Sequence, residues 1–207
     1  MKLVIFGATG PTGLALTQQA LHAGHEVTAL ARNPARMTIA HPKLRIVQGD
    51  VLDPPAVEQV VIGAEAVLSC LGVKPFAGKQ VQSRAGRHIV SAMQKHGVRR
   101  FIMESAYGVA ESRSLASPAL RAMISVFLSW TYNDKEVEEA EIKASGLDWT
   151  IIRPTALRNG PRTGKYRVGD DLCLGLGTWI NRADVADFML KQLTSTEWVR
   201  RTPAITN

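Results

Sequence analysis

Short apolar runs rich in β-branched residues alternate along the chain with longer stretches of helical spacing. The apolar runs lie at 3–7, 26–31, 44–49, 66–72, 100–105 and 149–154, and each has the length of a buried strand. In one intervening stretch Ala85, Ile89, Ala92 and Met93 recur at helical spacing before a stop at Gly97. This alternation predicts an α/β fold in which a mostly parallel sheet is covered by helices on both faces.

The pattern changes in the last quarter of the chain. The segment 157–181 contains too many glycines and prolines for a long helix, so we expect loops with short strands on the substrate side of a site. Helical spacing resumes at 181–193, with Val185, Phe188 and Met189 on one face. The apolar stretch 112–130 fits a buried helix, a lid or a partner-facing surface, and periodicity does not separate these three. No linker divides the chain, so residues 1–207 are expected to form one domain.

Composition is that of a soluble globular domain: 207 residues, 45% hydrophobic and 21% charged. The net charge of +7 is spread along the chain and favours small anions, whereas no motif indicates a specific nucleic-acid partner. Without a long apolar run or a leader pattern, we expect a cytoplasmic monomer or homodimer that does not bind membranes. Cys70 and Cys173 are too few for a disulfide framework or a metal site, and both are expected in the core.

The strongest motif is "FGATGPTG", which follows the first predicted strand and precedes a helix that buries Leu16, Ala20 and Ala23 and stops at Gly24. Glycines suit this turn because a phosphate must approach the backbone more closely than a Cβ allows, and because the helix must pack against the strand. The N–H groups of the first helical turn then face a pyrophosphate. The motif predicts a dinucleotide site built from Gly7, Thr9, Gly10, Pro11, Thr12 and Gly13.

The end of the second strand indicates which dinucleotide binds. A site for NAD places a carboxylate about 20 residues beyond the glycines to accept from the ribose 2′-hydroxyl. Here 27–49 contains no Asp or Glu, and "ARNPAR" supplies Arg32 and Arg36 instead. A guanidinium suits a 2′-phosphate, so we expect a preference for NADP(H) over NAD(H), although Arg32 can also be an ordinary surface arginine.

Two further strand ends complete the expected cofactor site. Asp50 and Val51 follow the third strand, where the carboxylate can accept from the adenine amino group and the Val51 N–H can donate to the ring. Asp50 can equally be a turn residue. Cys70, Leu71 and Gly72 end the fourth strand, where a glycine lets the chain pass close to a ribose.

Five motifs together carry a family resemblance: "GATGPTG", "GDVLD", "HGVRRFI", "SGLDWTIIRP" and "ADVADFMLKQL". The chain resembles, over nearly its whole length, the atypical short-chain dehydrogenases of the NmrA-like group, which have a doubly wound Rossmann fold. Within that group it is most similar to the flavin reductase and biliverdin-IXβ reductase type. The late segments "TGKYRV" (163–168) and "DFML" (187–190) belong to this likeness.

The resemblance implies an NADPH-dependent reductase that passes a hydride to a flavin or a related planar acceptor, with flavin as a substrate and not a prosthetic group. It places Arg32 at the 2′-phosphate, Ser105 of "ESAYG" beside the nicotinamide, and Pro154 and Thr155 nearby. One departure is Thr155, which stands where the flavin-reductase type has a histidine after the strand-six proline. A proton-donating role of that histidine therefore does not transfer.

The stretch "TYNDKEVEE" (131–139) leaves the proton donor open. Conventional short-chain dehydrogenases use Tyr-x-x-x-Lys, but Tyr132 and Lys135 are only three apart, which turns the tyrosine about 100° away on a helix. We therefore favour a helix start capped by Asn133 or Asp134, and keep Ser105 and Lys135 as candidate catalytic residues. Hydride transfer to a flavin needs alignment more than a protein acid. The alternatives are a non-catalytic NADP(H)-sensing regulator, and a carbonyl reductase or epimerase that uses Tyr132 or Tyr107.

Overall fold

The computed structural model describes residues 1–72 and 80–207 and has an eight-stranded sheet at its centre. The strands stand in the order β3-β2-β1-β4-β5-β6-β10-β8, and only β8 runs antiparallel to its neighbour. Their bounds are β1 (Lys2–Phe6), β2 (Glu26–Ala31), β3 (Leu44–Gln48), β4 (Ala66–Ser69), β5 (Arg100–Glu104), β6 (Asp148–Pro154), β8 (Arg167–Gly169) and β10 (Ala204–Thr206). The order 3-2-1-4-5-6 is that of doubly wound dinucleotide-binding sheets, which confirms the predicted Rossmann fold.

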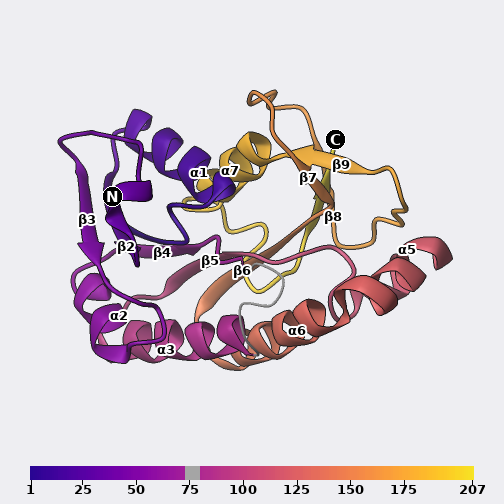
Figure 1. Ribbon diagram of the computed structural model, residues 1–207, viewed down its shortest axis with the longest axis horizontal. Coiled ribbons are helices and arrows are strands. Elements are labelled where there is room, and N and C mark those ends of the chain that lie inside the picture. The colour runs from indigo at the N-terminus through magenta and orange to yellow at the C-terminus, as the bar shows by residue number, and fades with distance from the viewer. Residues whose placement is uncertain (73–79) are drawn as a thin grey trace.

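Helices cover both faces of this sheet (Figure 1). On one face lie α1 (Pro11–His22) and α7 (Arg182–Lys191), and on the other lie α2 (Pro54–Val61), α3 (Val81–Lys95) and α6 (Ser129–Ala144). Two separate apolar cores result because strand side chains alternate between the faces. In β5, Ile102 packs in the core under α1 and α7, whereas Phe101 and Met103 pack toward α2, α3 and α6.

All six predicted strands form, but several end before the expected residue because the chain turns out of the sheet at the carboxyl edge. The helix after the glycine loop ends near Gly24, where φ is +85°, and α3 ends at Lys95, two residues before Gly97, where φ is +70°. Ala23 was expected in the core, and this is wrong: it is the C-cap residue of α1 and is exposed. The strand β10 was not predicted from the sequence, and it has only three residues.

The glycine-rich segment after β6 forms short strands, as expected. β7 (Ala156–Arg158) pairs with β9 (Trp179–Asn181) in a separate two-stranded sheet, while β8 extends the main one. The loop between β7 and β8 is tied to α7, because the Asp184 carboxylate accepts from the N–H groups of Thr163 and Gly164 at 2.7 and 2.9 Å. These bonds fix the segment beside the carboxyl ends of the strands.

The stretch 112–130 forms α4 (Ser112–Leu115), α5 (Pro118–Met123) and a single π-helical turn, η2 (Ile124–Leu128), which runs into α6. Ile124 is buried, but Val126 and Phe127 are 70% and 71% exposed. A fully buried helix is therefore excluded for this stretch, and the lid and the partner-facing surface stay as predictions.

The two cysteines differ in their surroundings. Cys70 lies in the core, as expected, but Cys173 is exposed, so the expectation for that residue is wrong. Cys173 lies in the loop between β8 and β9, where Leu174 and not the cysteine turns inward. Within 1–72 and 80–207, no helix has the length and apolar character to cross a membrane.

Candidate functional site

The glycine loop joins β1 to α1 and has the geometry of a phosphate cradle. Gly7 has a φ of +76°, and a Cβ there would lie 2.4 Å from the carbonyl oxygen of Cys70. A Cβ on Gly13 would lie 2.1 Å from the carbonyl oxygen of Gly7. Pro11 occupies the first position of α1, and the first turn leaves backbone N–H groups without helical partners. The loop therefore fits a pyrophosphate at the helix N-terminus.

Two arginines lie next to the end of β2. Arg32 directly follows the strand, and Arg36 ends the short 3₁₀ helix η1 (Pro34–Arg36). Both side chains are exposed, and Asn33 fixes the turn between them by accepting from the N–H of Ala35 at 3.1 Å. Two exposed guanidinium groups at this strand end are compatible with a 2′-phosphate.

Asp50 and Val51 follow β3 at the same edge of the sheet. The Asp50 Oδ1 atom accepts from the N–H of Leu52 at 2.9 Å, so this carboxylate stabilises its own turn. The Val51 carbonyl contacts Nδ1 of His88 at 3.1 Å. Asp50 is thus a turn residue, and its Oδ2 atom is the one left for a ligand.

Cys70, Leu71 and Gly72 continue beyond β4. Burial raises the pKa of the Cys70 thiol, which lies 3.6 Å from Sδ of Met189, so this side chain belongs to the core. The part of Cys70 that faces the glycine loop is its backbone carbonyl. The Leu71 carbonyl accepts from Nε2 of Gln82 at 3.1 Å. A Cβ on Gly72 would have no neighbour within 4 Å among residues 1–72 and 80–207, so no contact within these ranges requires a glycine there.

Glu104, at the end of β5, was not among the residues predicted from the sequence. Its carboxylate accepts from the Thr12 hydroxyl at 3.1 Å, which joins the glycine loop to β5 inside the protein. Lys135 Nζ reaches the Glu104 backbone carbonyl at 3.5 Å. Burial raises the pKa of the Glu104 carboxyl, while the charge of Lys135 opposes this shift. The sequence signal for Glu104 was a charged residue at the end of the apolar run "RFIME".

Ser105 follows Glu104 and faces the other side of the sheet. Its hydroxyl donates to Oε1 of Glu139 on α6 at 2.6 Å, and its N–H donates to the Ile152 carbonyl at 2.7 Å. Glu139 also accepts from the guanidinium of Arg153 on β6, with Nε at 3.1 Å. Both Glu139 and Arg153 are almost completely buried. This ion pair was not predicted from the sequence, although an arginine within the apolar run "WTIIRP" indicates a buried partner.

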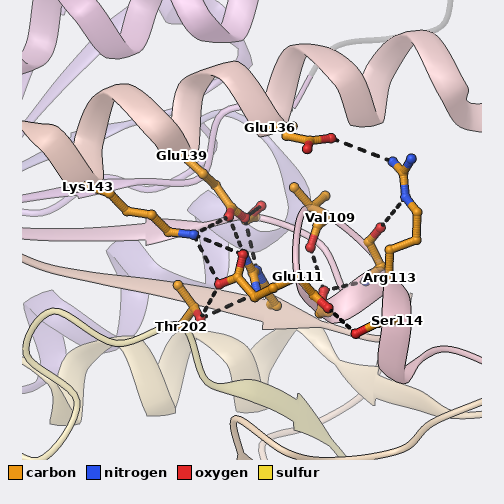
Figure 2. Close-up of polar contacts among 12 residues, drawn as sticks. Val109, Glu111, Arg113, Ser114, Glu136, Glu139, Lys143 and Thr202 are labelled. Atoms are coloured by element: carbon orange, nitrogen blue, oxygen red, sulfur yellow. Dashed lines mark hydrogen bonds and ion pairs between the residues drawn. The ribbon is translucent and has the colours of Figure 1, made fainter.

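A wider network of charges surrounds this ion pair (Figure 2). Glu139 and Lys143 point from α6 toward Glu111 and Thr202. Lys143 Nζ lies 3.1 Å from Glu111 and 3.5 Å from Glu139. Partial burial opposes ionisation of Glu111, but hydrogen bonds from Arg153 and Lys143 outweigh it and lower its pKa to about 2. The network holds the loop after β5 against α6 and β6.

The stretch "TYNDKEVEE" is not a helix start, which corrects the preferred interpretation. α6 begins at Ser129, so Asn133 and Asp134 lie inside it. Asp134 caps a different helix: its carboxylate accepts from the N–H groups of Gln82 and Ser83, at 2.9 and 3.2 Å, in the first turn of α3. Asp134 therefore stabilises the packing of α3 against α6.

The tyrosines considered as proton donors are bonded to the backbone. The Tyr132 hydroxyl donates to the Tyr107 carbonyl at 3.3 Å, and the Tyr107 hydroxyl donates to the Leu172 carbonyl at 2.8 Å. Burial raises the pKa of both phenols. Neither has the lowered pKa of an activated phenol, and Lys135 reaches Glu104 instead of Tyr132.

Pro154 and Thr155 lie where β6 ends. The Pro154 carbonyl accepts from the Tyr107 N–H at 2.9 Å, which keeps the loop after β5 close to β6. The Thr155 hydroxyl lies 3.2 Å from that of Thr206 on β10, and Thr155 is buried. The structure thus brings Ser105, Lys135 and the glycine loop together around Glu104, whereas the Thr155 side chain turns toward β10.

A separate groove of about 440 Å³ lies at the other edge of the sheet. It is lined by residues at the amino ends of β1, β2 and β3, among them Lys2, Glu26 and Lys43. Ligands of open α/β sheets bind beyond the carboxyl ends of the strands. This groove is therefore not part of the candidate site.

Comparison with known proteins identifies the family. A family model described as NAD(P)H-binding matches residues 7–196. An uncharacterised chloroplastic protein of Arabidopsis thaliana is 31% identical over 207 residues, which cover 95% of this chain and 73% of that protein.

Solved structures share the fold at low sequence identity. The anaerobillin reductase ChuY from Escherichia coli O157:H7 matches with a TM-score of 0.83 and 23% identity, covering 99% of this chain and 96% of that one. A wide-type short-chain dehydrogenase/reductase from Veillonella parvula, solved in complex with NADP, matches with a TM-score of 0.81 and 21% identity, covering 100% and 94%. The chain therefore belongs to the NAD(P)H-binding family, as its glycine loop and later motifs predicted, and it shares the Rossmann fold of these solved structures.

Proposed function

We propose that the protein is an NADPH-dependent reductase that passes a hydride to a flavin, a quinone or a similar planar acceptor. The observation that carries the choice of acceptor is Tyr132, whose hydroxyl is bonded to a backbone carbonyl and whose pKa is raised by burial. A simple carbonyl needs a positioned acid for the developing alkoxide, whereas an oxidised flavin or quinone holds the charge until water supplies the proton. The reductase activity named for ChuY is consistent with this proposal.

The residues divide into groups along the cofactor. The glycine loop holds the pyrophosphate through backbone N–H groups, since the Thr12 side chain is bonded to Glu104. Arg32 and Arg36 hold the 2′-phosphate, and Asp50 and Val51 hold the adenine. Cys70, Leu71 and Gly72 line the ribose through their backbone, and Lys135 lies near the second ribose. NADPH, when bound, would supply the hydride, and Ser105 would orient its nicotinamide end, beside the backbone of Pro154 and Thr155.

Acceptor reduction is the direct test of this function. We expect the purified protein to oxidise NADPH when FMN or a small quinone is added, and Tyr132→Phe to keep at least half of the rate, because this phenol is not the proton donor. The measurement is NADPH absorbance against a control without acceptor. Turnover with carbonyl substrates alone, lost in Tyr132→Phe, would instead establish the carbonyl-reductase alternative.

Cofactor preference is tested at the end of β2. We expect Arg32→Ala to remove most of the preference for NADPH over NADH, because the 2′-phosphate loses a charge-assisted hydrogen bond of about 1.5–3 kcal/mol. Thermal-shift titration with both cofactors measures this, since stabilisation depends on concentration relative to Kd. Arg45→Ala, on β3, is the matched control. An unchanged preference in Arg32→Ala would assign the role to Arg36 or to another residue.

A second candidate function is NADP(H) sensing, which Val126 and Phe127 favour. These two side chains form an exposed apolar patch on η2, and a protein partner can cover such a patch. Under this alternative NADPH binds but no acceptor is reduced. The acceptor assay and the cofactor titration together therefore separate the two functions.

A further inference from the structure

The hydrogen bond between Ser105 and Glu139 fixes which way the serine hydroxyl donates. Glu139 is a carboxylate paired with the buried guanidinium of Arg153, so it can only accept. A serine hydroxyl has one proton, and at 2.6 Å that proton lies toward Oε1 of Glu139. What Ser105 offers to any other group is a lone pair of its oxygen.

Rotation of the hydroxyl away from Glu139 is unfavourable. The serine would exchange a charge-assisted hydrogen bond in the protein interior for a neutral one, and Glu139 would lose a donor in a region that water does not reach. The backbone of Ser105 is also fixed, because its N–H donates to the Ile152 carbonyl at 2.7 Å. The contacts of Ser105 with α6 and β6 therefore fix its hydroxyl oxygen as a hydrogen-bond acceptor for any further group.

The position of Ser105 indicates what it accepts from. The glycine loop after β1 would hold a pyrophosphate at the point where the strand order reverses, with the adenosine half over β2 and β3. The other half of the cofactor would then lie over β4, β5 and β6. Ser105 directly follows β5 on that side. At its reactive end, a nicotinamide carries one strong donor, the NH₂ of its carboxamide.

We propose that Ser105 acts solely as a hydrogen-bond acceptor for the carboxamide NH₂ of the nicotinamide, and that Glu139 is the positioning residue that enforces this direction. This inference rests on the proposed function, because it requires NADP(H) in the site. It assigns Ser105 to recognition of the cofactor ring, and it removes the serine as a proton donor to the acceptor substrate.

Cofactor analogues test the proposal in the unmodified protein. In 3-acetylpyridine adenine dinucleotide phosphate a methyl group replaces the NH₂, whereas the thionicotinamide analogue retains the NH₂. We expect the acetylpyridine analogue to bind about five- to tenfold more weakly than NADP, and the thionicotinamide analogue to bind within about twofold of it. Calorimetric Kd values measure this, and equal affinity for NADP and the acetylpyridine analogue overturns the proposal.

Variants then connect this discrimination to the serine. Ser105→Ala should reduce the ratio of the two Kd values to about 1, while Ser105→Thr, which keeps a hydroxyl, should retain most of it. Glu139→Gln should also reduce the ratio, because an amide NH₂ can donate to the serine oxygen and occupy its lone pair. Ser114→Ala is the matched control, since Ser114 is exposed and donates to the Glu111 carbonyl.

The ratio of two affinities separates positioning from stability. If Ser105 or Glu139 had a purely structural role, its substitution would weaken the binding of both ligands equally. The ratio of the two Kd values would then be unchanged, which would contradict the proposal. Failure of NADP itself to bind would overturn the proposed function and this inference together. Binding of NADP without discrimination would overturn the inference alone.

Discussion

Gly13→Ala is expected to remove NADPH binding below detection. The new Cβ would lie 2.1 Å from the Gly7 carbonyl oxygen and 2.8 Å from the Ala8 Cα, and both neighbours are backbone atoms that cannot rotate away. The loop must therefore open, which displaces the N–H groups that face the pyrophosphate. We also expect a loss of at least about 1–3 kcal/mol in the free energy of unfolding, the usual effect of overpacking. Thermal-shift titration and urea unfolding measure the two effects.

Gly24→Ala is the matched control, because it separates steric contact from backbone strain. Gly24 has a φ of +85°, but a Cβ there would have no neighbour within 4 Å. We expect a loss of about 1–2 kcal/mol from the left-handed conformation and no change in NADPH affinity. Gly7→Ala combines both effects and should be the least stable of the three variants. Normal NADPH affinity in Gly13→Ala would contradict the cradle geometry.

The geometry of the glycine loop was predictable from sequence because its determinants are local. Gly7, Gly10 and Gly13 lie within one turn between a strand and a helix, so their spacing in sequence fixes their spacing in the fold. The position of Arg32 directly after β2 was predictable for the same reason, because it follows an apolar run with the length of a strand. The mostly parallel sheet followed from strand and helix alternation.

The contacts of Ser105 were less predictable because its partners are far apart in sequence. The Ser105 and Glu139 side chains meet only when β5 and α6 pack together, and the sequence pattern around Glu139 is that of a solvated helix face. The same reason explains the error at Asp134: an acid near the start of a helical pattern resembles a local cap, but tertiary packing directs it to α3. Likewise, the start of α6 was misplaced because the π-helical turn at 124–128 leads directly into it.

The buried ion pair should also dominate stability on this side of the sheet. We expect Arg153→Met to lower the free energy of unfolding by about 3–5 kcal/mol, because it leaves the Glu139 carboxylate buried with Ser105 and Lys143 as its remaining partners. Methionine fills a similar volume, so a cavity contributes little to this loss. Urea unfolding at neutral pH measures it, with the slope of the transition as a check on two-state behaviour.

Arg99→Met provides the comparison that isolates burial from charge. Arg99 also forms a side-chain ion pair, with Asp148 at 3.0 Å, but 62% of its side chain is exposed against 1% for Arg153. Exposed ion pairs typically contribute about 0–1 kcal/mol to stability. The free energy of unfolding of this variant should therefore be close to that of the wild type. Equal losses in the two variants would show that the Arg153 pair is screened by water, and this would also remove the basis for a fixed direction of the Ser105 hydrogen bond. If only Arg153→Met loses a large part of the free energy of unfolding, the Arg153 guanidinium that keeps Glu139 a hydrogen-bond acceptor also stabilises the fold.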